Sequence, residues 1–144
     1  MGRNSAAKRS LGFSPRRSLP RWSRDAFAGR AADGDVVLFV DTFDRYFEPE
    51  NARAAVRVLE RAGYRPILPA PRGRPLCCGR IYLASGMLDR ARAEMERTVR
   101  ALLPYAERGL PIVGLEPSCL LTFRDELIAL LGERGNRSPE MRSC

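Results

Sequence analysis

Five consecutive apolar residues at positions 36–40 narrow the possible folds of this chain more than any other stretch. An unbroken apolar run of this length fits a strand buried on both faces, as in a parallel sheet. The residues that follow have a helical pattern, because Pro49 suits a first helical turn, positions 55, 56, 59 and 62 are apolar on one face, and Gly63 is a stop signal. Strand followed by helix is the unit from which parallel sheets are built.

The same unit recurs twice more. Residues 64–68 predict a shorter strand, which Pro66 places at the edge of the sheet. After a loop at 69–75, Ser85 is the expected N-cap of a long apolar-striped helix that ends near Pro104 and Gly109. Residues 111–115 predict a third strand, and a helix opened by Glu116 and Pro117 is expected to run to residue 131. The sequence therefore predicts an α/β fold with a three-stranded parallel sheet and right-handed crossovers.

Charge separates the termini from this folded part. Eight basic residues and one acidic residue in 1–30 account for +7 of the net charge of +8, which leaves +1 for the rest. We interpret residues 1–34 as a basic linker or tail, 35–131 as one domain, and 132–144 as a disordered tail with a stray thiol at Cys144. Trp22 and Phe27 are exceptions within the first segment, because apolar groups of this size predict that it packs against something.

Composition excludes several kinds of site. The chain has no histidine, which removes catalysis by histidine-dependent triads and every histidine-based metal site. Four cysteines are too few for a disulfide framework at this length, and no apolar run is long enough for a signal peptide or a membrane span. We therefore expect a cytoplasmic protein whose site is built from thiols, carboxylates and hydroxyls.

Candidate site residues follow the ends of the predicted strands. Asp41 and Thr42 follow the first strand, Cys77 and Cys78 come after the loop beyond the second, and Glu116 and Cys119 follow the third. Because the carboxyl ends of parallel strands share one edge of a sheet, these side chains are expected to converge there. A disulfide between the neighbours Cys77 and Cys78 would strain the backbone, so the pair favours a metal centre.

Local context supports that interpretation and leaves alternatives. Cys119 falls in the first turn of a predicted helix, where the helix dipole favours a thiolate, the form that binds soft metals. Gly79 permits a positive φ beside the paired thiols. The thiols are alternatively small buried hydrophobic groups, and Asp41 and Glu116 are alternatively plain helix caps.

Several motifs together resemble a known family. They lie at residues 38–43, 47–50, 76–79, Gly86 and 111–119, and their order and spacing are similar to those of the cysteine-rich CCG domain. That domain occurs in heterodisulfide reductase, in iron-sulfur subunits of glycolate oxidase and anaerobic glycerol-3-phosphate dehydrogenase, and at the C-terminal end of FAD-linked D-lactate or 2-hydroxyacid dehydrogenases. The resemblance covers about residues 36–131 and implies one CCG repeat.

The resemblance also implies a ligand set and partners. The five cysteine positions of the family fall on Thr42, Cys77, Cys78, Glu116 and Cys119, so that two of the five are replaced here. Cys77, Cys78 and Cys119 are then the expected ligands of an iron-sulfur cluster of the [4Fe-4S] class or of zinc, with oxygen from Asp41, Thr42 or Glu116. FAD is expected on a missing or partner domain, and the partners are that flavin domain and a ferredoxin-like iron-sulfur domain or subunit.

The resulting hypothesis is an electron-transfer module, part of an FAD-linked 2-hydroxyacid oxidoreductase of the lactate or glycolate type, which is not expected to be catalytic alone. One alternative is a metal-free module that serves as a docking surface for those domains. A second is nucleic-acid binding through the arginine-rich tail, although that tail carries neither an aromatic stacking pattern nor a recognised motif, and we expect no nucleic-acid partner.

Overall fold

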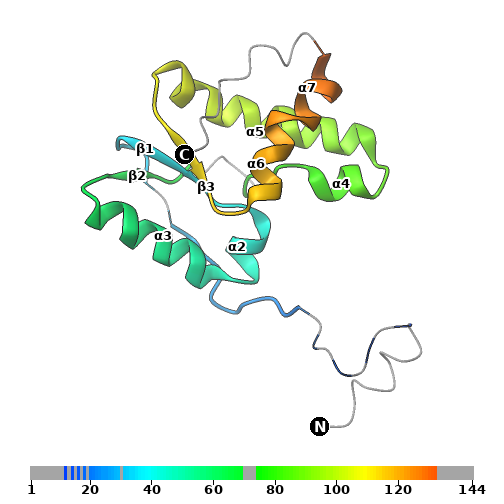
Figure 1. The fold of residues 1–144 in the computed structure, drawn as a ribbon, viewed down its shortest axis with the longest axis horizontal. Helices are drawn as coiled ribbons and strands as arrows, with labels where there is room; N and C mark the ends of the chain where they lie inside the picture. Colours follow the sequence, from blue (N-terminus) through cyan, green and yellow to red (C-terminus); the bar gives the residue numbers. More distant parts are fainter. Residues whose placement is uncertain are drawn as a thin grey trace.

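A three-stranded parallel sheet lies at the centre of the fold, as predicted (Figure 1). The computed structural model describes residues 12, 14, 16, 18, 20–29, 31–69 and 74–132. Its elements in chain order are β1 (Val36–Phe39), α2 (Thr42–Tyr46), α3 (Pro49–Arg61), β2 (Pro66–Ile67), α4 (Arg80–Ala84), α5 (Leu88–Glu107), β3 (Ile112–Gly114), α6 (Pro117–Arg124) and α7 (Glu126–Leu131).

The central strand is β1, and the strand order is β2-β1-β3. Val36 is opposite Pro66, and Val37 is opposite Ile112, with all three strands parallel. Every residue of β1 is buried, which explains why its sequence is apolar without alternation. Pro66 lies on an edge strand, as its missing N–H group predicts.

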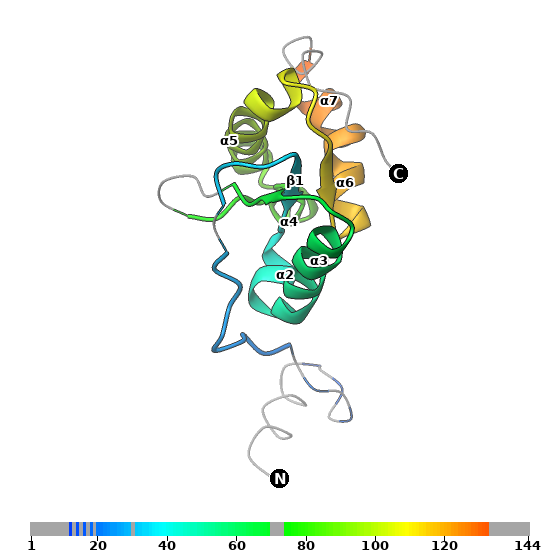
Figure 2. The same ribbon diagram turned by 90° about the vertical axis from the view of Figure 1, so that its left-hand side faces the viewer.

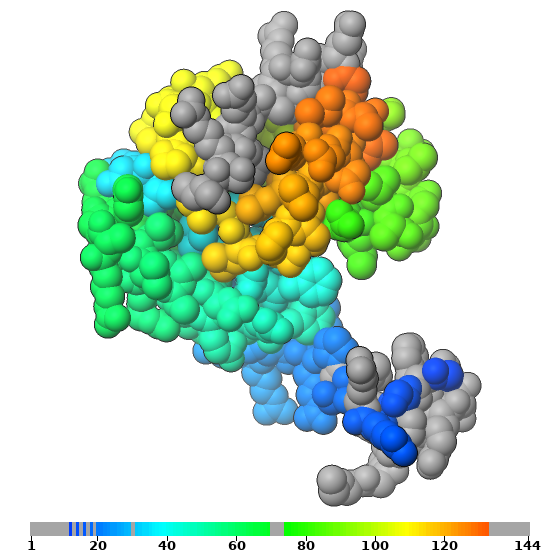
Figure 3. Space-filling view, viewed as in Figure 1, coloured from blue at the N-terminus to red at the C-terminus, as the bar shows by residue number. Residues whose placement is uncertain are grey.

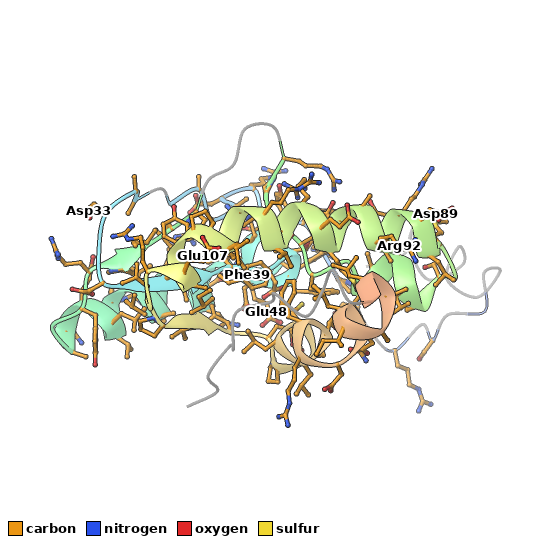
Figure 4. All side chains as sticks on the ribbon, turned by 90° about the horizontal axis from the view of Figure 1, so that it is seen from above. Asp33, Phe39, Glu48, Asp89, Arg92 and Glu107 are labelled. Carbon is orange, nitrogen blue, oxygen red and sulfur yellow. The ribbon has the colours of Figure 1, made fainter. Side chains whose placement is uncertain are left out.

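Helices cover both faces of the sheet (Figure 2). Val37 and Phe39 belong to a core cluster with Met95 of α5 and Phe123 of α6, while Leu38 belongs to a second cluster that includes residues of α3. Phe39 lies beside α5, whereas Asp89 and Arg92 lie at the N-terminal end of that helix, where both are exposed (Figure 4). The alternation of side chains along one strand thus divides the apolar core into two layers.

An N-terminal segment, residues 20–29, packs against α2 (Figure 3). The backbone N–H groups of Ser23 and Phe27 donate to the carbonyl groups of Tyr46 and Arg45. The Trp22 ring lies 4.7 Å from the Phe47 ring between centroids, although the Trp22 side chain is 64% exposed. The expectation that these apolar residues pack against something is confirmed. Most of the basic tail and residues 133–144, including Cys144, lie outside the described residues.

Three sequence expectations about elements were wrong. Ser85 caps the C-terminal end of the unpredicted helix α4, and the long helix α5 begins three residues later at Leu88. The strand expected at 64–68 has only two residues, because the backbone of Leu68 turns to pair antiparallel with Ala31. The last helix is divided at Asp125.

A local hydrogen bond explains the division of the last helix. The Thr122 hydroxyl donates to the carbonyl of Ser118, a local bond that bends helices near the observed break. Helix α5 continues through Pro104 and ends only before Gly109, whose φ of 73° ends the helix. Within the described residues, no helix combines the length and apolar character that a membrane crossing needs.

Candidate functional site

The three thiols of the described residues meet at the end of the sheet. Thr42 begins α2 after a two-residue connection from β1, and Cys119 lies in the first turn of α6 after β3. Cys77 and Cys78 precede α4. Together these four residues line one pocket of about 490 Å³, which is within the usual size of a small-molecule site. The structure therefore brings together Thr42 and all three predicted cysteines.

Apolar side chains form most of the remaining wall of the pocket. Trp22, Phe43, Phe47, Ile81 and Ala84 are of this kind, and the polar or charged members are Arg80 and Ser118. Trp22 comes from the N-terminal segment, so a residue outside the predicted domain also lines the thiol site. Arg80 is held at the rim by Glu126 of α7, with 3.2 Å between guanidinium nitrogen and carboxylate oxygen.

Gly79 sets the path of the backbone beside the paired thiols. Its φ is 82°, a conformation that side-chain-bearing residues rarely adopt. A Cβ atom there would lie 3.0 Å from the carbonyl oxygen of Ala91 and 3.1 Å from Cγ of Met95. Glycine therefore lets the thiol turn lie directly against α5.

Helix α5 holds the segment that leads into this turn. Glu94 is fully buried, and its carboxylate pairs with the guanidinium groups of Arg74 and Arg97. Arg97 also donates to the backbone carbonyl of Arg74 at 3.0 Å, and the Thr98 hydroxyl donates to the carbonyl of Cys77 at 2.8 Å. We call Glu94, Arg97 and Thr98 the α5 clamp, because their polar groups hold residues 74–77 in place.

Sequence reasoning missed this clamp. The sequence does contain an indication of it. Glu94 lies three positions after Ala91 and directly before Met95, so it falls on the apolar face of the helix. A carboxylate on an apolar helical face is buried only when it is paired.

The sulfur atoms form a connected row. The Cys78 thiol donates to Sγ of Cys119 at 3.0 Å, and both side chains are buried. Cys77, which is half-buried, interacts with Cys78 and with the Thr42 hydroxyl. The hydrogen bond to Cys119, together with burial, raises the pKa of the Cys78 thiol to about 12. The hydrogen bond to Cys78, together with burial, also raises the pKa of the Cys77 thiol. Cys77 and Cys78 are therefore both protonated at neutral pH.

The two predicted carboxylates cap helices. Oδ1 of Asp41 accepts from the backbone N–H groups of Phe43 and Asp44, at 2.7 and 3.3 Å. The carboxylate of Glu116 accepts from the N–H group of Ser118 at 2.9 Å, and hydrogen bonds with Ser118 lower the pKa of Glu116. Neither carboxylate is among the groups that line the pocket.

Asp41 and Asp44 form an acidic pair beside the site. Oδ2 of Asp41 is buried, and the described residues supply it with no hydrogen-bond donor. Burial and a hydrogen bond to Asp41 raise the pKa of the neighbouring Asp44 to about 6. Below about pH 6, where Asp44 is protonated, its carboxyl group can donate a hydrogen bond to Asp41.

Comparison with known proteins relates this chain to dehydrogenases. It is 27% identical to D-2-hydroxyglutarate dehydrogenase of Pantoea ananatis over 128 residues, which are 88% of this chain and 12% of that protein. It is 30% identical to the Escherichia coli protein of the same name over 100 residues, covering 68% of this chain and 9% of the other. Identity to one of the subunits of the E. coli anaerobic glycerol-3-phosphate dehydrogenase is 28% over 127 residues, or 81% of this chain and 31% of that protein.

The chain is therefore related to one part of these dehydrogenases. It spans only about a tenth of the length of the two D-2-hydroxyglutarate dehydrogenases. No family model matches the sequence, and no solved structure matches the fold.

The thiols suit a soft metal by chemical type but not by spacing. Sulfur atoms that share one tetrahedral zinc ion, with bonds of about 2.3 Å, lie about 3.8 Å apart. Cys78 and Cys119 are closer, with 3.0 Å between their sulfurs. Among the described residues, no three cysteine, aspartate or glutamate side chains are arranged to hold a metal ion. Metal binding therefore requires the sulfurs to move apart by somewhat less than about 1 Å.

Proposed function

We propose that this chain is an electron-transfer module of the CCG type that works with an FAD-linked 2-hydroxyacid dehydrogenase. The names of the related proteins support an oxidoreductase context. The observation that carries the proposal is the gathering of Cys77, Cys78 and Cys119 with Thr42 at one apolar pocket. Thiols are the side chains in this chain that can exchange electrons or bind a redox-active metal.

In this proposal the dehydrogenation takes place elsewhere. A flavin-containing partner oxidises the hydroxyacid, a ferredoxin-like partner takes part in transfer, and the present module acts after the flavin. Cys77, Cys78 and Cys119 are the proposed protein ligands of a [4Fe-4S]-class cluster or of zinc. Thr42 is the oxygen candidate that already lines the pocket, whereas Asp41 and Glu116 would first have to release the backbone N–H groups that they cap.

Anaerobic purification followed by metal analysis and visible absorption tests the ligand proposal. We expect stoichiometric iron or zinc in the unaltered chain and loss of that metal in Cys78→Ser and Cys119→Ser. Cys144→Ser is the matched control, since this thiol lies outside the proposed ligand set, and it should retain the metal. A folded, colourless and metal-free unaltered chain would contradict metal binding.

A metal-free docking module is the second candidate. It is favoured by the spacing of the described thiols and by the capping bonds that engage both carboxylates. It predicts that Cys78→Ser leaves binding to a flavin-containing partner unchanged, as measured by calorimetry. A roughly tenfold loss of affinity in Cys78→Ser, with Cys144→Ser unchanged, would exclude a purely structural role for the thiols.

A further inference from the structure

A concentration of positive charge near the start of the chain takes no part in the thiol site. Residues 1–24 contain seven basic side chains and no acidic one. The structure describes three of these basic residues, and all three are exposed: Arg16, Arg21 and Arg24. The first acidic residue of the chain, Asp25, is paired with Arg53 of α3, with 2.8 Å between carboxylate oxygen and guanidinium nitrogen. The positive charge of residues 1–24 therefore has no acidic counterpart within the segment.

The fold presents an aromatic side chain from within this basic segment. Trp22 is 64% exposed, and its ring lies 4.7 Å from the Phe47 ring and 5.0 Å from the Tyr46 ring between centroids. The backbone N–H group of Ser23 donates to the carbonyl of Tyr46 at 2.6 Å, and the buried Phe27 anchors the segment in the core. An indole that is already oriented in this way loses little conformational freedom when it binds a surface.

Two further apolar side chains extend the exposed surface around Trp22. Phe43 of α2 is 56% exposed, and Ile81 of α4 is 59% exposed. Both line the same pocket as Trp22, so that large apolar groups from three separate parts of the chain border one opening. Exposed apolar groups that gather in one place mark interaction surfaces.

We propose that the basic segment, residues 1–24, binds the surface of an anionic phospholipid bilayer, with the Trp22 ring inserted among the headgroups. Basic residues combined with exposed aromatic and aliphatic groups are typical of proteins that bind such surfaces. A nucleic acid would attract the same charges, but Ile81 has no aromatic face on which a base could stack, whereas all three apolar groups suit lipid. The inference does not depend on the metal binding or the electron transfer proposed above.

Fluorescence of the full-length chain tests this proposal, because Trp22 is the only tryptophan. The probes are vesicles of phosphatidylglycerol and phosphatidylcholine in equal parts, and vesicles of phosphatidylcholine alone. We expect the anionic vesicles to shift the Trp22 emission to shorter wavelength, and brominated acyl chains in those vesicles to quench it. Binding should weaken as salt is raised, since ions screen the attraction. Vesicles without phosphatidylglycerol should leave the emission unchanged.

Substitutions provide the matched comparison, with affinity measured by co-sedimentation and folding by circular dichroism. Arg21→Gln together with Arg24→Gln should lower the affinity about 25-fold, or about fivefold for each basic residue. Arg57→Gln together with Arg61→Gln is the control, because it removes the same charge from two exposed arginines of α3 outside the segment. That control should change the affinity by less than about twofold. Trp22→Ala should lower the affinity about tenfold. Quenching in the unaltered chain locates the indole even where a variant does not fold.

An emission spectrum that anionic vesicles leave unchanged would overturn the proposal. So would equal binding to phosphatidylcholine alone, equal losses of affinity in the two arginine pairs, or binding to polyuridylate without binding to vesicles. Metal content is measured on the chain without vesicles, so failure of lipid binding and failure of the proposed metal binding are distinguishable.

Discussion

Replacement of Glu94 by glutamine should loosen the segment that carries the paired thiols. The carboxylate of Glu94 is fully buried and pairs with Arg74 and Arg97, whose side chains are 59% and 24% exposed. Glutamine keeps the shape and one acceptor oxygen but removes the charge that both guanidinium groups face.

The expected decrease in the free energy of unfolding is about 2 kcal/mol. Removing one partner from a fully buried ion pair typically destabilises a protein by about 3–5 kcal/mol. The smaller value applies here because both arginines reach water and can be solvated when the carboxylate is lost. Arg97 also loses the partner that aligns it with the backbone of residue 74, so the effect should extend to the thiol turn.

Urea unfolding followed by far-ultraviolet circular dichroism measures the change, and the alkylation rate of Cys77 reports on the thiol turn. Glu96→Gln is the matched control on the same helix, because Glu96 is 47% exposed and 3.9 Å from Arg100. We expect that control to change stability by less than about 0.5 kcal/mol. Equal effects of Glu94→Gln and Glu96→Gln would refute the reasoning that a buried ion pair holds residues 74–77.

The remaining predictions concern substitutions at Asp44, Gly79 and Thr98. Burial raises the folded-state pKa of Asp44 from 3.8 to about 6, so this group disfavours folding as pH rises through that range; Asp44→Asn should stabilise the protein by about 1–2 kcal/mol at pH 7 and by nearly nothing at pH 4. Gly79→Ala should destabilise it by about 2 kcal/mol through its positive φ and the contact with Ala91. Thr98→Val should destabilise it by about 1–2 kcal/mol, since the carbonyl of Cys77 loses its donor.

Denaturant titrations check all three. A stabilisation by Asp44→Asn that is the same at pH 4 and pH 7 would show that ionisation is not its cause. For the backbone substitution, Gly86→Ala is the control, since Gly86 also has a positive φ but open space around it; equal losses at Gly79 and Gly86 would remove the role assigned to the contact with α5. Unchanged stability and unchanged Cys77 alkylation in Thr98→Val would contradict the clamp.

Some parts of the fold could be predicted because their cause is local. The apolar run at 36–40 and the edge position of Pro66 follow from burial and from the missing proline N–H group. Helices α2 and α4 were missed because each has only five residues, too few for a periodic apolar face to be visible. Because α4 was not predicted, Ser85 at its C-terminal end was assigned instead to the N-terminus of the next helix.

The candidate site divides in a similar way. The alternation of strands and helices and the shared edge of a parallel sheet were enough to predict that residues following β1 and β3 meet the paired cysteines. The capping of α2 by Asp41 was anticipated as an alternative, because aspartate before a helix is a local signal. Trp22 as part of the pocket wall and the α5 clamp involve residues distant in the sequence, for which no local pattern specifies the partner.

The sequence by itself determined that strands and helices alternate, and that thiols follow two of the three strands, because hydrophobic periodicity and helix punctuation are properties of neighbouring residues. Only the tertiary structure decided how the thiols stand toward one another. The packing of α5 and α6 on β1 places Cys78 and Cys119 in direct contact at 3.0 Å and leaves Cys77 beside Thr42. Distances of this kind depend on how separate elements pack, which no pattern of neighbouring residues specifies.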